Sequence, residues 1–144
     1  MRLQCLNCLI AMMLAGVTLC SAQETKTAVK HTAAAATSPA SGKEMFVSYC
    51  ASCHGKDAKG DGPAANALKQ APADLTSLAK QNGGKYPAEK VTSVLRGQTT
   101  LMAHGDQDMP VWGPVFWKMS QGHEEQVQMR IANLNQYIES LQEK

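Results

Sequence analysis

The chain has 144 residues, a formal net charge of +2 and 44% hydrophobic residues. From residue 41 onward, eleven basic and eleven acidic residues balance, which argues against nucleic acid as a partner and against strong electrostatic attachment to a membrane. We therefore expect these roughly 100 residues to form one domain.

The N-terminus has the pattern of a signal peptide. The run 3–19 carries no charge, and the small residues Cys20 and Ala22 suit cleavage after Ala22. We therefore expect residues 1–22 to be removed and the remainder to be exported to the periplasm. Two alternatives remain open. The uncharged stretch is just long enough to span a bilayer uncleaved, and Cys20 is a weaker candidate for lipid attachment because Leu19 precedes it.

Residues 23–40 form an Ala- and Thr-rich stretch that lacks aromatic residues and contains Val29 as its single large aliphatic side chain. Such a segment buries too little apolar surface to order itself, so we predict a flexible arm. The folded domain is expected to cover residues 41–144.

A helix is predicted over residues 42–53, and its end carries the pattern Cys-x-x-Cys-His, formed by Cys50, Cys53 and His54. Thiols three residues apart lie on one side of a helical turn, so both can bond to the vinyl groups of one porphyrin. The histidine that follows them can then reach the iron. The pattern therefore predicts one covalent c-type haem with His54 as an iron ligand.

Two other uses of a Cys-x-x-Cys pair fit less well. A structural zinc site needs four ligands, and without the signal peptide no other cysteine remains. The histidines His31, His104 and His123 have no ligand spacing with the pair. A thioredoxin-like redox pair requires a strand–helix–strand pattern, which the sequence lacks. Because both remaining cysteines belong to the haem motif, we expect no structural disulfide.

The rest of the domain alternates helices and loops. In chain order we expect a turn-rich loop at 55–63, a short helical piece at 64–69, a helix start at 72–75 capped by Asp74, a break at 81–86, a helix from Pro87 to Gly97, a long loop at 98–117 and a helix at 124–141. The last helix is the clearest, because Val127, Ile131 and Leu134 recur on one face. No alternating strand pattern occurs, so the predicted fold class is all-α.

Together these features resemble the class I cytochrome c family, of the bacterial type. In that family the first helix carries Gly, an aromatic residue and the first haem cysteine at four-residue steps, as Gly42, Phe46 and Cys50 do here. The last helix of the family carries a Leu and, three residues later, an aromatic residue, matched by Leu134 and Tyr137. The resemblance spans the whole domain. It implies the class I cytochrome c fold, with crossing N- and C-terminal helices and further helices around one haem.

The second iron ligand is chosen among several side chains of the domain: Met45, Met102, Met109, Met119, Met129 and His104. The family ends its ligand loop in Met-Pro-x-Trp-Gly, and Met109 begins the same pattern here. The resemblance therefore implies Met109. Met102 is the next candidate, and His104 is the one that would change the chemistry most.

The resemblance also suggests supporting roles. The family directs the other ring nitrogen of the axial histidine to the carbonyl of a Gly-Pro proline, which implies Pro63 here. We expect Trp112 to wall the haem, with Trp117 and Tyr86 as further candidates for the wall or the propionate contacts. Ordinary core packing is an equal alternative for each of these three rings.

A His/Met pair fills both axial positions and leaves no site for oxygen, peroxide or substrate. We therefore expect a periplasmic electron carrier, not an enzyme, with unidentified redox proteins as donor and acceptor. The alternative is a haem-bearing electron-entry subunit of a larger dehydrogenase or oxidase complex. A third interpretation, a haem enzyme or gas sensor, requires Met109 to leave the iron.

Overall fold

The structure is a computed structural model that describes residues 34–98 and 109–143. Its elements in chain order are α1 (Gly42–Met45), the π-helical turn η1 (Phe46–Cys50), α2 (Ala51–His54), the 3-10 turns η2 (Ala65–Ala67) and η3 (Leu75–Ser77), α3 (Leu78–Gln81), α4 (Ala88–Arg96), α5 (Trp112–Met119) and α6 (Glu124–Ser140). Every element within these ranges is helical and none is a strand, so the predicted all-α class is confirmed.

The first three elements, α1, η1 and α2, follow one another without a break and carry the haem motif at their end. Ser41 caps the start, because its hydroxyl accepts a hydrogen bond from the Glu44 amide at 3.2 Å. The π-helical turn in the middle adds a residue to the usual helical spacing, a local change that often accompanies functional sites. The predicted helix over 42–53 is therefore present, with this turn inside it.

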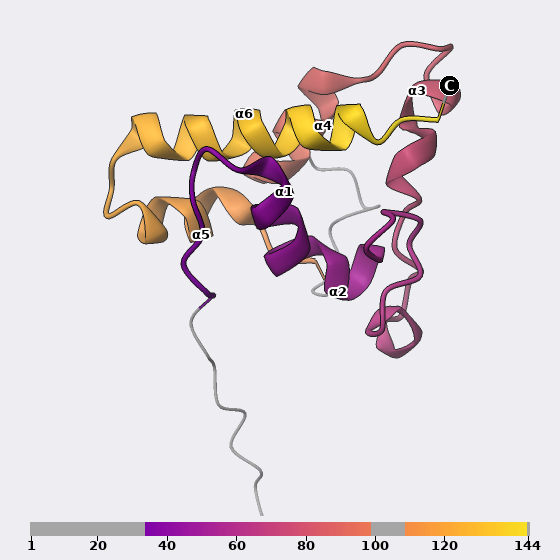
Figure 1. Ribbon diagram of the computed structural model, residues 1–144, viewed down its shortest axis with the longest axis horizontal. Helices are drawn as coiled ribbons and strands as arrows, with labels where there is room; N and C mark the ends of the chain where they lie inside the picture. Colours follow the sequence, from indigo (N-terminus) through magenta and orange to yellow (C-terminus); the bar gives the residue numbers. More distant parts are fainter. Residues whose placement is uncertain (1–33, 99–108, 144) are drawn as a thin grey trace, which may run out of the picture. The chain divides into compact units, whose positions relative to one another are not determined.

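α1 crosses α6 at very short distance (Figure 1). A Cβ atom added to Gly42 would lie 2.0 Å from the backbone oxygen of Asn133, so no larger residue fits at the crossing. Beside this point the rings of Phe46 and Tyr137 pack in a tilted arrangement with centroids 5.5 Å apart. The crossing of the N- and C-terminal helices that the resemblance implied is thus observed.

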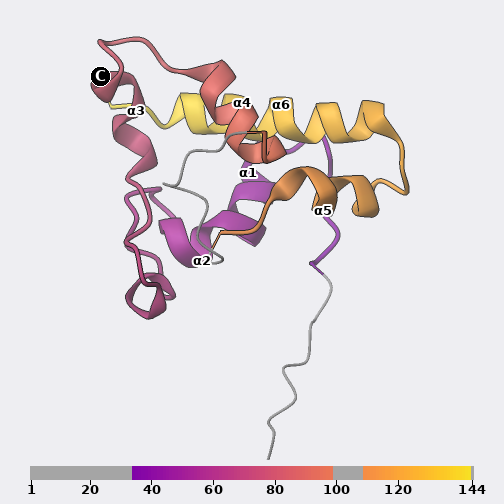
Figure 2. The ribbon, with the colours of Figure 1, turned by 180° about the vertical axis from the view of Figure 1, so that it is seen from behind.

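α5 runs beneath α6, as both views show (Figure 1, Figure 2). The sequence predicted a loop over 98–117, and from Trp112 onward this prediction was wrong. Trp112 and Phe116 stand four residues apart, so both face the core, and Phe116 is completely buried. Pro114 lies in the first turn of α5, where a missing amide hydrogen leaves no helical bond unmade.

Residues 34–40 pack against the domain, which corrects the predicted boundary at Ser41. Thr37 is buried, and its hydroxyl and carbonyl oxygens accept hydrogen bonds from Arg130 at 3.1 and 3.0 Å. The Thr37 hydroxyl also lies 2.8 Å from the hydroxyl of Tyr49, and Asn133 donates to the carbonyl of Pro39 at 2.9 Å. These partners come from α6 and from the helix that carries the haem motif, so the segment is part of the folded unit.

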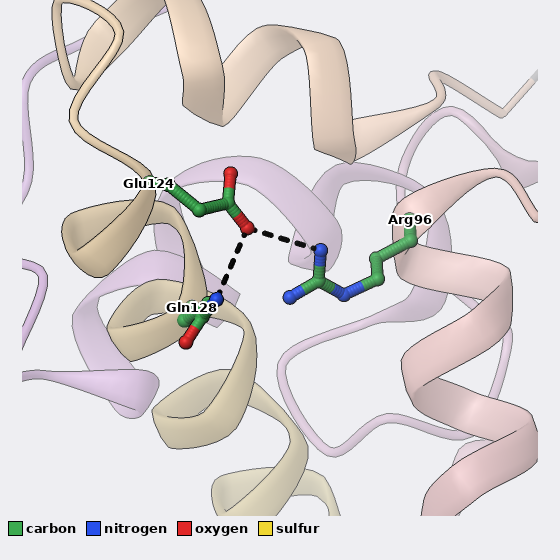
Figure 3. A network of polar contacts seen from close by, with 3 residues as sticks. All are labelled: Arg96, Glu124 and Gln128. Carbon is green, nitrogen blue, oxygen red and sulfur yellow. Dashed lines mark hydrogen bonds and ion pairs between the residues drawn. The ribbon is translucent and has the colours of Figure 1, made fainter.

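α4 is attached to α6 by two sets of polar contacts. The hydroxyl of Tyr86, just before α4, donates to Oδ1 of Asn135 at 2.5 Å. At the other end of α4, Arg96 forms an ion pair with Glu124 at 3.4 Å, and Gln128 donates to the same carboxylate at 3.3 Å (Figure 3). The partly buried Tyr86 contact holds α4 against α6, whereas the exposed ion pair adds little free energy.

Several predicted features lie outside the described residues. They are the signal peptide at 1–22, most of the arm at 23–40, and the alternative iron ligands Met102 and His104. Among the helices of the described part, none combines the length and the apolar character needed to span a bilayer.

Candidate haem site

One apolar cavity of about 360 Å³ lies between the haem-motif helix, η3, α3, α4 and the start of α5. Cys50, Cys53, His54 and Met109 all line it. Most of the remaining wall is aliphatic or aromatic: Tyr49, Leu75, Leu78, Val91, Val94 and Trp112. The volume falls in the range of cofactor pockets, about 300–1,000 Å³, and the few polar groups converge on one apolar space.

The two motif cysteines stand at different depths in this wall. Cys50 is buried, and Cys53 is partly exposed. Burial raises the pKa of the Cys50 thiol to about 12, and the neighbouring Cys53 adds to the rise. A site that disfavours a thiolate this strongly suits an uncharged sulfur. An uncharged sulfur is what the thioether bonds of a covalent haem require.

His54 ends α2 and is buried, with its ring at the cavity. Its Nδ1 atom lies 3.0 Å from the backbone oxygen of Ala73, a contact that orients the ring. The predicted acceptor was Pro63, and the structure corrects this to Ala73. Pro63 follows Gly62 in a turn that folds back onto the motif helix instead, since the Gly62 amide donates to the Cys53 carbonyl at 3.0 Å.

The carbonyl of Ala73 is held in place by the turn that follows it. Asp74 caps η3 as predicted: its carboxylate accepts hydrogen bonds from the amide and the hydroxyl of Thr76 at 2.8 and 2.6 Å. The hydroxyl bond is the main reason that the pKa of the Asp74 carboxyl is lowered. The amide of Leu75 donates to the carbonyl of Ala58 at 2.8 Å, which ties η3 to the loop after the haem motif.

Met109 lies at the cavity two residues before Val111, which precedes α5, and it is partly buried against the core. Trp112 begins α5, is 6% exposed and lines the same cavity. Its indole stacks on Tyr49 with centroids 5.2 Å apart. The structure therefore brings the predicted ligand and the predicted wall residue to one space with the haem motif.

The two other rings that the sequence offered as haem walls lie elsewhere. Trp117 is half-exposed and borders a separate surface hollow with Arg96 and Glu124. Tyr86 directs its hydroxyl to Asn135 on α6 and is not part of the cavity wall. The alternative of ordinary packing therefore describes Tyr86, whereas Trp117 lies at the surface and fits neither expectation.

Ala73 is the site residue that sequence reasoning missed. Its contribution is a backbone oxygen, which any residue type supplies, so the identity of the side chain carries no signal. The nearest available sign was the capping pattern of Asp74, which fixes the turn immediately after it.

The described residues fit a haem. Cys50 and Cys53 offer thiols that can bond to the haem, and His54 offers an imidazole whose Nδ1 is hydrogen-bonded to Ala73. Met109 offers its side-chain sulfur, and the surrounding wall is apolar. Within residues 34–98 and 109–143, no group of three or more His, Cys, Asp or Glu side chains gathers as a metal site would require. An all-α fold around such a cavity defines a monohaem c-type cytochrome domain with the class I fold.

A comparison with protein families agrees with this class. The family described as "Cytochrome C oxidase, cbb3-type, subunit III" matches residues 37–121, more than half of the chain. The chain therefore belongs to this family of cytochrome c domains, and its function is haem-based electron transfer. No curated protein matched the chain. No solved structure matched it either.

Proposed function

We propose that this protein is a periplasmic electron carrier that passes single electrons through one covalent c-type haem with closed His/Met coordination. The observation that carries the proposal is the shared cavity, because Cys50, Cys53, His54 and Met109 come from two distant parts of the chain and line one apolar space. A bound haem supplies a one-electron couple, and the protein supplies ligands, dielectric and surface.

Each residue has a defined role in this proposal. Cys50 and Cys53 form the two thioether bonds, and His54 and Met109 take the two axial positions of the iron. Ala73 accepts the hydrogen bond from His54 Nδ1, which keeps the ring orientation fixed and raises the basicity of the imidazole. Trp112 forms part of the wall and excludes water from the cavity.

The domain organisation follows from the same proposal. Residues 1–22 direct export and are removed, residues 23–33 link the export signal to the domain, and the folded domain begins near Thr37. The buried contacts of Thr37 with Arg130 support this boundary. Donor and acceptor are redox proteins outside the cytoplasmic membrane, and membrane contact arises only where the N-terminal segment is retained.

A second function has one specific observation in its favour. The matched family is described as subunit III of a cbb3-type cytochrome c oxidase, so the same domain also suits an electron-entry subunit of an oxidase complex. In that case the partner is the rest of the complex, and the exchange of electrons takes place within one assembly.

Purification from the source cells separates the two functions. A C-terminal affinity tag is added to the full chain, cells are fractionated, and each fraction is purified in mild detergent. The carrier predicts a haem protein in the soluble periplasmic extract, free of other chains, which is oxidised by added membranes. Recovery in fixed stoichiometry with larger membrane-bound haem proteins contradicts the carrier and establishes the subunit.

A further inference from the structure

The end of the chain contacts the turn behind the haem ligand. Gln142 lies two residues past α6, and its Nε2 atom donates hydrogen bonds to the carbonyls of Leu75 at 2.7 Å and Ile138 at 2.9 Å. Its Oε1 atom accepts a hydrogen bond from the amide of Ala79 at 2.8 Å. One side chain thus joins the end of α6 to both η3 and α3. In Figure 1 the yellow segment that follows α6 runs to the side of α3.

These contacts require an amide side chain. Two carbonyl oxygens need donors and one backbone amide needs an acceptor, and glutamine offers both from a single group. A carboxylate keeps the acceptor and loses both donors, and an apolar side chain of equal length loses all three bonds. A backbone bond runs in parallel, since the Glu143 amide donates to the carbonyl of Thr76 at 2.9 Å.

The segment held by Gln142 is the one that orients His54. Leu75 stands two residues after Ala73, whose carbonyl oxygen lies 3.0 Å from Nδ1 of the His54 ring. On its other side the amide of Leu75 donates to the carbonyl of Ala58, in the loop after the haem motif. The placement of the Ala73 carbonyl therefore depends on support from both sides of η3, and Gln142 supplies the support on the side of α6.

We propose that Gln142 is a positioning residue for the axial histidine: it holds η3 so that the Ala73 carbonyl stays aligned with His54 Nδ1. This inference rests on the proposed role of His54 as an iron ligand. A carbonyl acceptor makes the ligated imidazole more basic, which favours the oxidised iron. Loss of the Gln142 contacts therefore weakens this hydrogen bond and raises the midpoint potential.

The test uses the full holoprotein with Gln142→Met, which keeps side-chain length and adds no charge. The first readout is the solvent exchange rate of the His54 Nδ1 proton, measured by NMR in the reduced protein. We expect exchange to accelerate roughly tenfold, as the loss of buried hydrogen bonds implies. The second readout is the midpoint potential, which we expect to rise. Gln136→Met, at an exposed position of α6, is the matched control and should change neither.

A purely structural role gives a different result. In that case Gln142→Met lowers the thermal unfolding temperature and leaves both the exchange rate and the midpoint potential at the wild-type values, which overturns the proposal. If Gln142→Met does not yield folded protein, Gln142→Glu tests the same proposal through the exchange rate of the His54 Nδ1 proton and the midpoint potential. It retains the bond from Ala79, and its exchange rate must exceed that of Gln136→Glu. A separate outcome contradicts the proposed function itself. If the wild type shows neither an Nδ1 proton signal from His54 nor a sulfur-to-iron band when oxidised, the proposed coordination of the iron by His54 and Met109 is wrong.

Discussion

His54 and Met109 face the same cavity, but the chain holds these two side chains by different means. On the His54 side, backbone groups from three segments form a continuous set of hydrogen bonds that includes Ala73 and Leu75. On the Met109 side, packing of neighbouring side chains dominates: Trp112 stacks on Tyr49, and the buried Phe116 lies against both.

The difference teaches which substitutions each side tolerates. Where the contacting atoms belong to the backbone, the side chains of those residues can change freely, provided that the side chains that hold the turn, Asp74 and Gln142, remain. Where side chains make the contacts, their identity matters. We therefore expect the His54 side to respond to changes of backbone geometry and the Met109 side to changes of residue type.

The largest effect is expected from Met109→Ala, which removes the proposed ligand on the side that depends on residue identity. The midpoint potential should fall by about 0.1 V or more, within the roughly 0.8 V range that axial ligands span. Carbon monoxide should then bind to the reduced protein. Potentiometry and a carbon monoxide titration measure both effects. Met102→Ala should neither lower the potential nor allow carbon monoxide to bind. If Met102→Ala opened the iron instead, our assignment of Met109 as the ligand would be wrong.

On the His54 side, a substitution that displaces the backbone near Ala73 should lower the stability of the domain. A Cβ atom at Gly60, where φ is +84°, would lie 2.4 Å from the carbonyl oxygen of Pro72, next to Ala73. Gly84 has nearly the same φ, +87°, and open space around it. Gly60→Ala should therefore reduce the free energy of unfolding by about 1–3 kcal/mol more than Gly84→Ala, measured by denaturant titration. Equal losses would show that the contact with Pro72 is unimportant.

A smaller effect is expected where α4, which forms another wall, is attached to α6. Burial raises the pKa of the Tyr86 phenol above its usual value of 10, and the charge of Glu139 adds to the rise. The folded state thus keeps this proton more tightly than the unfolded state. The stabilisation is complete below pH 10 and is lost as the pH rises from there through the folded-state pKa.

Tyr86→Phe tests this contribution. The substitution should lower the free energy of unfolding by about 1 kcal/mol at neutral pH, because the hydrogen bond to Asn135 is lost. It should also flatten the decline of stability above pH 10 in denaturant titrations at several pH values. A variant that declines as steeply as the wild type would assign the alkaline effect to another group.

The smallest effect concerns the exposed end of α4. Arg96 and Glu124 form an ion pair whose side chains are 26% and 46% exposed. Glu124→Gln should therefore change the free energy of unfolding by less than about 1 kcal/mol, and the change should shrink at high salt. A larger, salt-independent loss measured by thermal unfolding would mean that the carboxylate has a role beyond this pair.

The parts that the sequence predicted well have strong local patterns. The helix at 124–141 shows an uninterrupted apolar face, and the structure places α6 at nearly the same residues. Gly97 ends α4 as predicted, with a left-handed conformation at the cap. At the site, the spacing of Cys50, Cys53 and His54 requires that they lie together on one helical turn, so their placement at one cavity follows from the sequence alone.

The parts that the sequence missed depend on contacts between distant segments. Residues 34–40 have the composition of a flexible arm, yet Thr37 is fixed by Arg130, which lies 93 residues later. The helix α5 begins inside the predicted loop, and its Gly-Pro pair is compatible with a first helical turn. The acceptor for His54 is a backbone carbonyl, so no residue type in the sequence identifies it.

The most direct test of the account is the absorption spectrum of the exported protein, oxidised, reduced, and reduced with carbon monoxide. The account predicts a c-type reduced spectrum, a far-red sulfur-to-iron band in the oxidised protein and no response to carbon monoxide. These features together mean that a histidine and a methionine close the iron for electron transfer, as proposed for His54 and Met109. Rapid carbon monoxide binding without the sulfur band would contradict the account and favour catalysis or gas sensing.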